Sequence, residues 1–165
     1  MESLPGKGAA FQLLLPAMES FPEPAAVKAA PLPLGRERIL IVDDEPELAM
    51  APKEILEHLG YEVYYRTNGM EALETFRRRL ADKPFDLVVT DLTMPHLTGV
   101  ELARELLDME PNLPIILCTG FSEKINAEQA ARLGIRGFLM KPVVIRELAE
   151  MIREVLDKRE KQADS

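Results

Sequence analysis

The chain of 165 residues is 47% hydrophobic, which is enough to bury the core of one ordinary domain but leaves no room for a second catalytic domain. Its 28 acidic residues outnumber its 20 basic residues, and the net charge of −8 repels nucleic-acid phosphates and anionic lipids, so direct binding to nucleic acid or membrane is not expected. No apolar stretch reaches the roughly 20 residues of a membrane span, no secretion signal is recognisable and the one cysteine suits a reducing compartment, which together predict a cytoplasmic protein.

Proline content divides the chain near residue 38. Residues 1–38 contain six of the 13 prolines, and the Pro/Ala-rich stretch within them shows no hydrophobic periodicity. We therefore predict a leading segment over 1–17, an extended linker over 18–38, one domain over 39–158 and a short tail over 159–165.

From residue 39 onward, short apolar runs alternate with amphipathic stretches of helical length. The pattern predicts strands over 39–42, 61–65, 85–90, 114–118 and 137–140, and helices over 46–59, 69–81, 98–109, 122–133 and 145–158. Five such β-α units predict a doubly wound α/β fold, (βα)5, around a five-stranded parallel sheet with helices on both faces. Pro52 lies well inside the first helix, so we expect a kink or a late start there.

Five polar residues stand directly after the apolar strand runs: Asp43, Asp44, Asp91, Thr119 and Lys141. The carboxyl ends of parallel strands form the ligand-binding edge of such a sheet, so these side chains are expected to share one pocket. Three converging carboxylates need a cation, and oxygen ligands favour a hard ion such as Mg²⁺. A carboxylate beside that ion can attack phosphorus, while the lysine ammonium and threonine hydroxyl contact phosphoryl oxygens.

The motifs ILIVDDEP, DLVVTDLTMPHLTG, ILCTGF and GFLMKP, in this order, resemble the receiver domain of two-component response regulators, which has a flavodoxin-like fold. The resemblance covers residues 39–157. It implies that Asp91 is the phosphoacceptor, that Asp44 binds Mg²⁺ directly and that Asp43 binds it through water. It also implies a third protein ligand, the backbone carbonyl of Thr93.

The same resemblance implies a switch. In the family, phosphate draws the threonine inward and an aromatic ring follows it; here these residues are Thr119 and Phe138, and the output surface is formed by the fourth helix, fifth strand and fifth helix. The Lys141–Pro142 peptide bond is expected to be cis. Phe121, two residues after Thr119, is a candidate for slowing the hydrolysis of the acyl phosphate.

The first seventeen residues resemble the end of a histidine-kinase ATPase domain. Ser3-Leu-Pro-Gly-Lys-Gly8 followed by Phe11-Gln-Leu-Leu-Leu-Pro16 matches its glycine-rich turn and last strand, although Ala9-Ala10 replaces the usual threonine. The chain is then expected to be the carboxy-terminal receiver of a hybrid sensor kinase. The alternative is a disordered apolar leader.

Three functions are compatible with these residues. The first is a non-enzymatic phosphoacceptor that takes phosphate from a histidine kinase or histidine phosphotransfer protein; no kinase core is recognisable, and the nine residues after Leu156 leave no DNA-binding output domain. The second is an aspartate-nucleophile phosphatase, whose nucleophile and general acid lie two residues apart in one Asp-x-Asp motif; here Asp43 and Asp44 are adjacent, and Asp91 follows another strand. The third is an interaction module that does not use phosphate. The cognate kinase, stimulus, output partner and oligomeric state stay open.

Overall fold

The computed structural model describes residues 2–3, 9–10, 30–120 and 132–163. The chain divides into two compact units, Met1–Pro31 and Leu32–Ser165. In the first unit, strands β1 (Glu2–Ser3) and β2 (Ala9–Ala10) pair antiparallel. Most of the predicted linker and almost all of the predicted helix over 122–133 lie outside the described residues.

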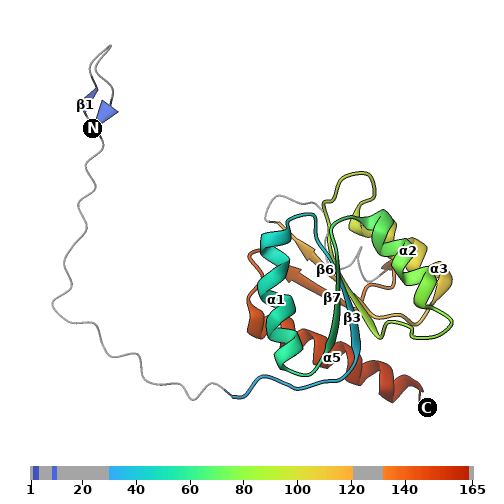
Figure 1. Cartoon of the computed structure of the whole chain (residues 1–165). Coiled ribbons are helices and arrows are strands. Elements are labelled where there is room, and N and C mark those ends of the chain that lie inside the picture. The colour runs from blue at the N-terminus through green and yellow to red at the C-terminus, as the bar shows by residue number, and fades with distance from the viewer. Residues whose placement is uncertain (1, 4–8, 11–29, 121–131, 164–165) are drawn as a thin grey trace. The chain divides into compact units, whose positions relative to one another are not determined.

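The second unit is built on the predicted parallel sheet (Figure 1). Its strands lie in the order β4-β3-β5-β6-β7, and every neighbouring pair is parallel. Each begins and ends within two residues of its predicted bounds: β3 (Arg38–Val42), β4 (Glu62–Arg66), β5 (Leu87–Asp91), β6 (Ile115–Thr119) and β7 (Gly137–Met140). The α/β fold expected from the sequence is therefore confirmed.

Helices cover both faces of the sheet (Figure 1). The bounds are α1 (Pro46–His58), α2 (Gly69–Arg79), α3 (Gly99–Met109) and α5 (Ile145–Ala163). Successive residues of β3 alternate between two cores: Leu40 and Val42 pack with α2 and α3, whereas Ile39 and Ile41 pack with α1 and α5. Burial on both faces explains why the strands read as unbroken apolar runs. Among the described helices, none has the length and apolarity to cross a bilayer.

Two of the helices begin at side-chain caps. Asn68 accepts a hydrogen bond of 2.9 Å from the backbone N–H of Glu71 at the start of α2, and Thr98 and Glu101 form a reciprocal capping box at the start of α3. By contrast, α1 begins at Pro46 and runs through Pro52, so the alternative of a late start is wrong. Proline suits the first turn, and α1 also gains from burying Leu56 completely against the sheet.

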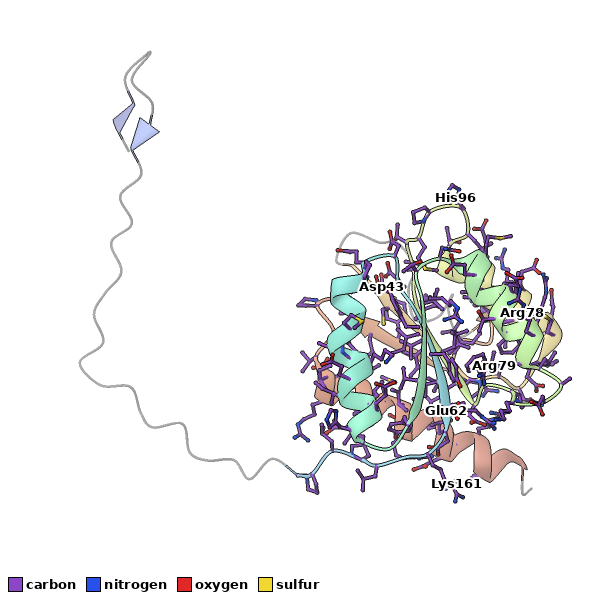
Figure 2. The ribbon with its side chains drawn as sticks, viewed as in Figure 1. Asp43, Glu62, Arg78, Arg79, His96 and Lys161 are labelled. Carbon is purple, nitrogen blue, oxygen red and sulfur yellow. The ribbon has the colours of Figure 1, made fainter. Side chains whose placement is uncertain are left out.

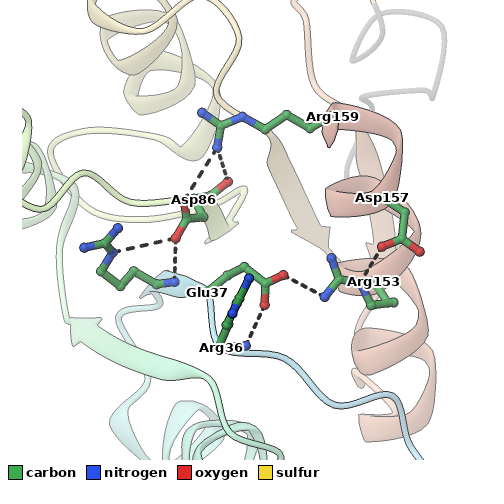
Figure 3. Close-up of polar contacts among 7 residues, drawn as sticks. Arg36, Glu37, Asp86, Arg153, Asp157 and Arg159 are labelled. Atoms are coloured by element: carbon green, nitrogen blue, oxygen red, sulfur yellow. Dashed lines mark hydrogen bonds and ion pairs between the residues drawn. The ribbon is translucent and has the colours of Figure 1, made fainter. Parts of the chain in front are cut away.

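Ion pairs extend the second unit beyond the predicted domain at both ends (Figure 3). At the leading end, Glu37 accepts a hydrogen bond of 2.7 Å from Arg153 of α5, so the last part of the predicted linker lies on the domain. At the other end, α5 continues to Ala163, five residues past its predicted end and through most of the expected tail. Arg159 fixes this extension because its guanidinium donates to the backbone carbonyl of Asp86 at 3.0 Å.

Candidate functional site

Three aspartates meet at the carboxyl edge of the sheet. Asp43 and Asp44 follow β3, and Asp91 ends the adjacent strand β5. Each offers a carboxylate oxygen that lies within 4.8 Å of the others. Asp43 lies at this edge in Figure 2, and Asp91 is only 6% exposed. The structure thus brings together residues that are up to 48 positions apart in the sequence, as the strand-end pattern predicted.

Lys141 joins this acidic cluster from the end of β7. Its Nζ lies 3.0 Å from a carboxylate oxygen of Asp43 and 3.0 Å from one of Asp91. Burial disfavours the charged ammonium, but the hydrogen bonds to the two carboxylates outweigh burial and raise the pKa of Lys141 to about 12. Burial also raises the pKa of Asp91, and the hydrogen bond and charge of Lys141 offset part of that rise. The ammonium of Lys141 therefore offsets part of the negative charge of the three aspartates.

Backbone contacts fix the position of the Asp43 side chain and the start of the loop after β3. The backbone N–H of Glu45 donates to the Asp43 carboxylate at 2.9 Å, and the hydroxyl of Tyr65 donates to the Asp43 carbonyl at 2.7 Å. Tyr65 is not among the site residues predicted from the sequence. Its alternation within β4 places it on the α1 and α5 side of the sheet, but no motif indicates that its hydroxyl reaches the neighbouring strand.

Gly99 holds the loop after β5 close to Asp91. A Cβ atom at this position would lie 2.0 Å from the backbone oxygen of Asp91 and 2.9 Å from its carbonyl carbon, so only glycine allows the first turn of α3 to pass there. The Gly99 N–H also donates to the carbonyl of Leu92 at 2.9 Å. The sequence indicated only that this glycine begins a helix; its contact with the site comes from the tertiary fold.

Thr119 and Phe138 lie on neighbouring strands. Thr119 ends β6 and is 1% exposed, and its carbonyl accepts a hydrogen bond of 2.7 Å from the backbone N–H of Lys141. Phe138 pairs in register with Leu117 on β6, two residues before Thr119, and is partly buried against the α2 and α3 core. The strand pairing therefore places the predicted switch residues on the same face of the sheet.

Three further predicted positions have different outcomes. The Lys141–Pro142 peptide bond is cis. Thr93 lies in the loop two residues after Asp91, and the role of its carbonyl stays a prediction. Phe121 lies outside the described residues.

The donor set suits a small hard cation. The three aspartates offer only oxygen atoms, which are the ligands that hard cations prefer. Asp43, Asp44 and Asp91 could therefore hold Mg²⁺. Fold and site together define a class of protein: a parallel α/β domain with an acidic, lysine-bearing pocket at the carboxyl edge of its sheet.

Comparison with known proteins names the family. Residues 39–153 match the model of the response regulator receiver domain. The chemotaxis protein CheY of Thermotoga maritima is 34% identical over 120 residues, which cover 72% of this chain and 97% of CheY. The sensor kinase CckA of Brucella abortus is 31% identical over 164 residues, covering 94% of this chain but only 17% of CckA.

A solved structure supports the same assignment. The CheY-like response regulator receiver domain protein of Methanospirillum hungatei superposes with a TM-score of 0.69 at 34% identity, covering 78% of this chain and 99% of that protein. The chain therefore belongs to the response regulator receiver domain family of two-component systems, which implies phosphoacceptor function. Domains of this family are generally phosphoacceptors rather than catalysts.

Proposed function

We propose that the chain accepts a phosphoryl group from a phosphohistidine onto Asp91, with the help of Mg²⁺. The donor is a histidine kinase or a histidine phosphotransfer protein. One observation supports the proposal most directly: Lys141 lies 3.0 Å from carboxylate oxygens of both Asp43 and Asp91, which belong to a cluster of three carboxylates. A lysine that bridges two acids at a sheet edge is placed to hold phosphoryl oxygens once a phosphate arrives.

The chemistry assigns a role to each side chain. A carboxylate oxygen of Asp91 attacks phosphorus, a new P–O bond forms, and the P–N bond to the donor histidine breaks, leaving its electron pair on the imidazole nitrogen. The ammonium of Lys141 stabilises charge on the transferring phosphoryl oxygens, and the hydroxyl of Thr119 donates to one of them. Asp43, Asp44, Asp91 and the Thr93 carbonyl would hold Mg²⁺, which would supply further positive charge to offset that of the phosphoryl oxygens.

Phosphorylation then changes a surface distant from Asp91. The contact of Thr119 with phosphate stabilises its inward position, and Phe138 occupies the space vacated beneath β6 and β7. This is a two-state equilibrium that phosphate biases because only one state offers it the threonine hydroxyl. The surface that changes includes β7 and α5, and a partner protein recognises the phosphorylated state through this surface.

We further propose that the chain is the receiver of a hybrid sensor kinase in the cytoplasm. The similarity to CckA covers 94% of the chain. The second unit, residues 32–165, contains 134 of the 165 residues and so accounts for only 81% of the chain. The similarity therefore extends into the leading unit, where residues 1–17 are interpreted as the end of an ATPase domain. Expression of the chain with the preceding kinase domains, followed by transfer of labelled phosphate to Asp91, tests this.

Intact-mass measurement tests the phosphoacceptor proposal. The purified chain is incubated with acetyl phosphate in Mg²⁺ or in EDTA, beside an Asp91→Asn variant. We expect the mass of one phosphoryl group on the wild type in Mg²⁺ only, and none on the variant. Equal labelling of the variant would contradict the proposal. Steady turnover of p-nitrophenyl phosphate would instead support the phosphatase alternative.

A further inference from the structure

The loop that carries Asp43 and Asp44 leads into a helix without a side-chain cap. The helix α1 begins at Pro46, and its N-cap residue Glu45 makes no side-chain capping hydrogen bond. By contrast, α2 and α3 both begin at a capping side chain. A cap on α1 therefore does not hold this loop, and other contacts must fix the two aspartates.

Both the backbone and the side chain of Asp43 are held by neighbouring segments. Its N–H donates to the carbonyl of Arg66 at 3.2 Å, which extends the pairing of β3 with β4 by one residue. Its carboxylate accepts hydrogen bonds from the Glu45 N–H at 2.9 Å and from the Lys141 ammonium at 3.0 Å. Its carbonyl accepts one from the Tyr65 hydroxyl at 2.7 Å. Tyr65 is thus a side chain that fixes the backbone of this aspartate.

The position of Tyr65 in the sheet explains this contact. Tyr65 pairs in register with Ile41 of β3, two residues before Asp43, and its ring is partly buried on the α1 and α5 side. The ring is long enough to carry its hydroxyl past the end of β3 to a carbonyl 22 positions away in the sequence. Phenylalanine could make the same packing contacts but has no hydrogen to donate.

We infer that Tyr65 is a positioning residue for the cation that Asp43 and Asp44 would hold. The carbonyl that accepts its hydrogen bond belongs to the peptide group between these two aspartates. Because a peptide group is planar, a rotation of this group would turn both aspartates relative to the rest of the site. Mg²⁺ demands near-ideal octahedral geometry, so such a rotation lowers its affinity. The inference deepens the proposed function and rests on it, since it concerns the same cation site.

Tyr64 provides a matched comparison on the other face of the sheet. It precedes Tyr65 in β4 and is partly buried against the α2 and α3 core. Its hydroxyl donates to Glu62 and accepts a hydrogen bond of 2.7 Å from Arg79, and neither partner belongs to the acidic cluster. Removing either hydroxyl therefore takes a hydrogen bond from a partly buried tyrosine, but only the Tyr65 hydroxyl contacts the loop of the aspartates.

An NMR titration of the whole chain with MgCl₂, without a phosphate donor, compares Tyr65→Phe, Tyr64→Phe and the wild type. We expect Tyr65→Phe to raise the Kd for Mg²⁺ by about twofold to fivefold, where fivefold corresponds to about 1 kcal/mol, the typical contribution of one neutral hydrogen bond. Tyr64→Phe should change the Kd by less than about 1.5-fold, because its partners are not shared with the site. Urea unfolding verifies that both variants are folded.

Phosphorylation gives a second readout. The Mg²⁺ concentration that supports half the maximal rate of labelling by acetyl phosphate should rise in Tyr65→Phe by the same factor as the Kd, and the maximal rate should change less. A purely structural role of Tyr65 would instead lower the free energy of unfolding and leave the Mg²⁺ dependence unchanged, which would contradict the inference.

The outcomes separate this inference from the proposed function. An unchanged Mg²⁺ affinity in the folded Tyr65→Phe variant, or equal weakening by the two variants, would overturn the role of Tyr65 even if the wild type takes phosphate on Asp91. A wild type that binds Mg²⁺ but takes no phosphate would contradict the proposed function, and the titrations of the two variants would still decide the role of Tyr65. A wild type that binds no Mg²⁺ would contradict both.

Discussion

Replacing Gly99 with alanine is predicted to destabilise the domain and to displace Asp91. The new Cβ would lie 2.0 Å from the Asp91 oxygen and 2.9 Å from its carbonyl carbon, far inside the optimal separation of about 3.5–4.0 Å for nonbonded carbon atoms. Both neighbours are backbone atoms, so no side-chain rotation relieves the overlap. The loop after β5 or the first turn of α3 must move by on the order of 1 Å.

The magnitude follows from three contributions. Overpacking of this kind costs about 1–3 kcal/mol, and weakening the hydrogen bond from Gly99 to Leu92 costs about 1 kcal/mol more. Alanine recovers about 0.5–1 kcal/mol because it loses less backbone entropy than glycine in a helix. The free energy of unfolding should therefore fall by about 1–3.5 kcal/mol, a substantial part of the 5–15 kcal/mol typical of a domain.

Gly69→Ala provides a matched control. Gly69 also begins a helix after a capping residue, but its Cβ would contact the Leu97 side chain at 3.0 Å and the Leu97 oxygen at 3.1 Å, so a small shift of this neighbour relieves it. Urea unfolding should place this variant within about 1 kcal/mol of wild type. Acetyl phosphate should label the Gly99→Ala variant more slowly than either. Wild-type stability and labelling rate in Gly99→Ala would refute the steric argument.

Two further changes test the ion pairs. Lys141→Met removes the ammonium that lies 3.0 Å from Asp43 and from Asp91, so the free energy of unfolding measured without Mg²⁺ should fall by about 1–3 kcal/mol. Added Mg²⁺ should restore part of this stability in thermal unfolding, and the variant should no longer be phosphorylated. Equal stability with and without the lysine would contradict this. A double-mutant cycle of Glu37→Gln and Arg153→Met should give a coupling of about 1 kcal/mol. Burial opposes the ionised form of Glu37, but the hydrogen bond from Arg153 and backbone N–H groups lower its pKa below 4.5. The contribution of the Glu37–Arg153 pair to stability is therefore present above the unfolded-state pKa of Glu37 and disappears as pH falls through the lower folded-state pKa. A coupling free energy that stays unchanged at acid pH would contradict this ion pair.

Most of the fold could be predicted from the spacing of apolar residues in the sequence. Apolar runs such as Ile39–Val42 marked strands because helices cover both faces of the sheet, and polar residues after those runs marked the site because parallel strands end at one edge. Asp43, Asp91 and Lys141 could thus be brought together before any coordinates, although their distances could not.

Other features depend on contacts between distant residues, which no local pattern encodes. The bond between Glu37 and Arg153 joins residues 116 positions apart, and it places the end of the predicted linker on the domain. The contact of Arg159 with Asp86 likewise extends α5 through residues expected to form a tail. The helix α1 continues through Pro52, so the burial of its apolar side outweighs the low helix propensity of proline.

The identity of the phosphorylated residue tests the account most directly. After treatment with acetyl phosphate and Mg²⁺, borohydride reduction converts an aspartyl phosphate into homoserine, and fragmentation of the resulting peptides locates it. The account predicts homoserine at position 91 alone, and none when Mg²⁺ is withheld. Homoserine at position 43, 44 or 86 with Asp91 intact would contradict it.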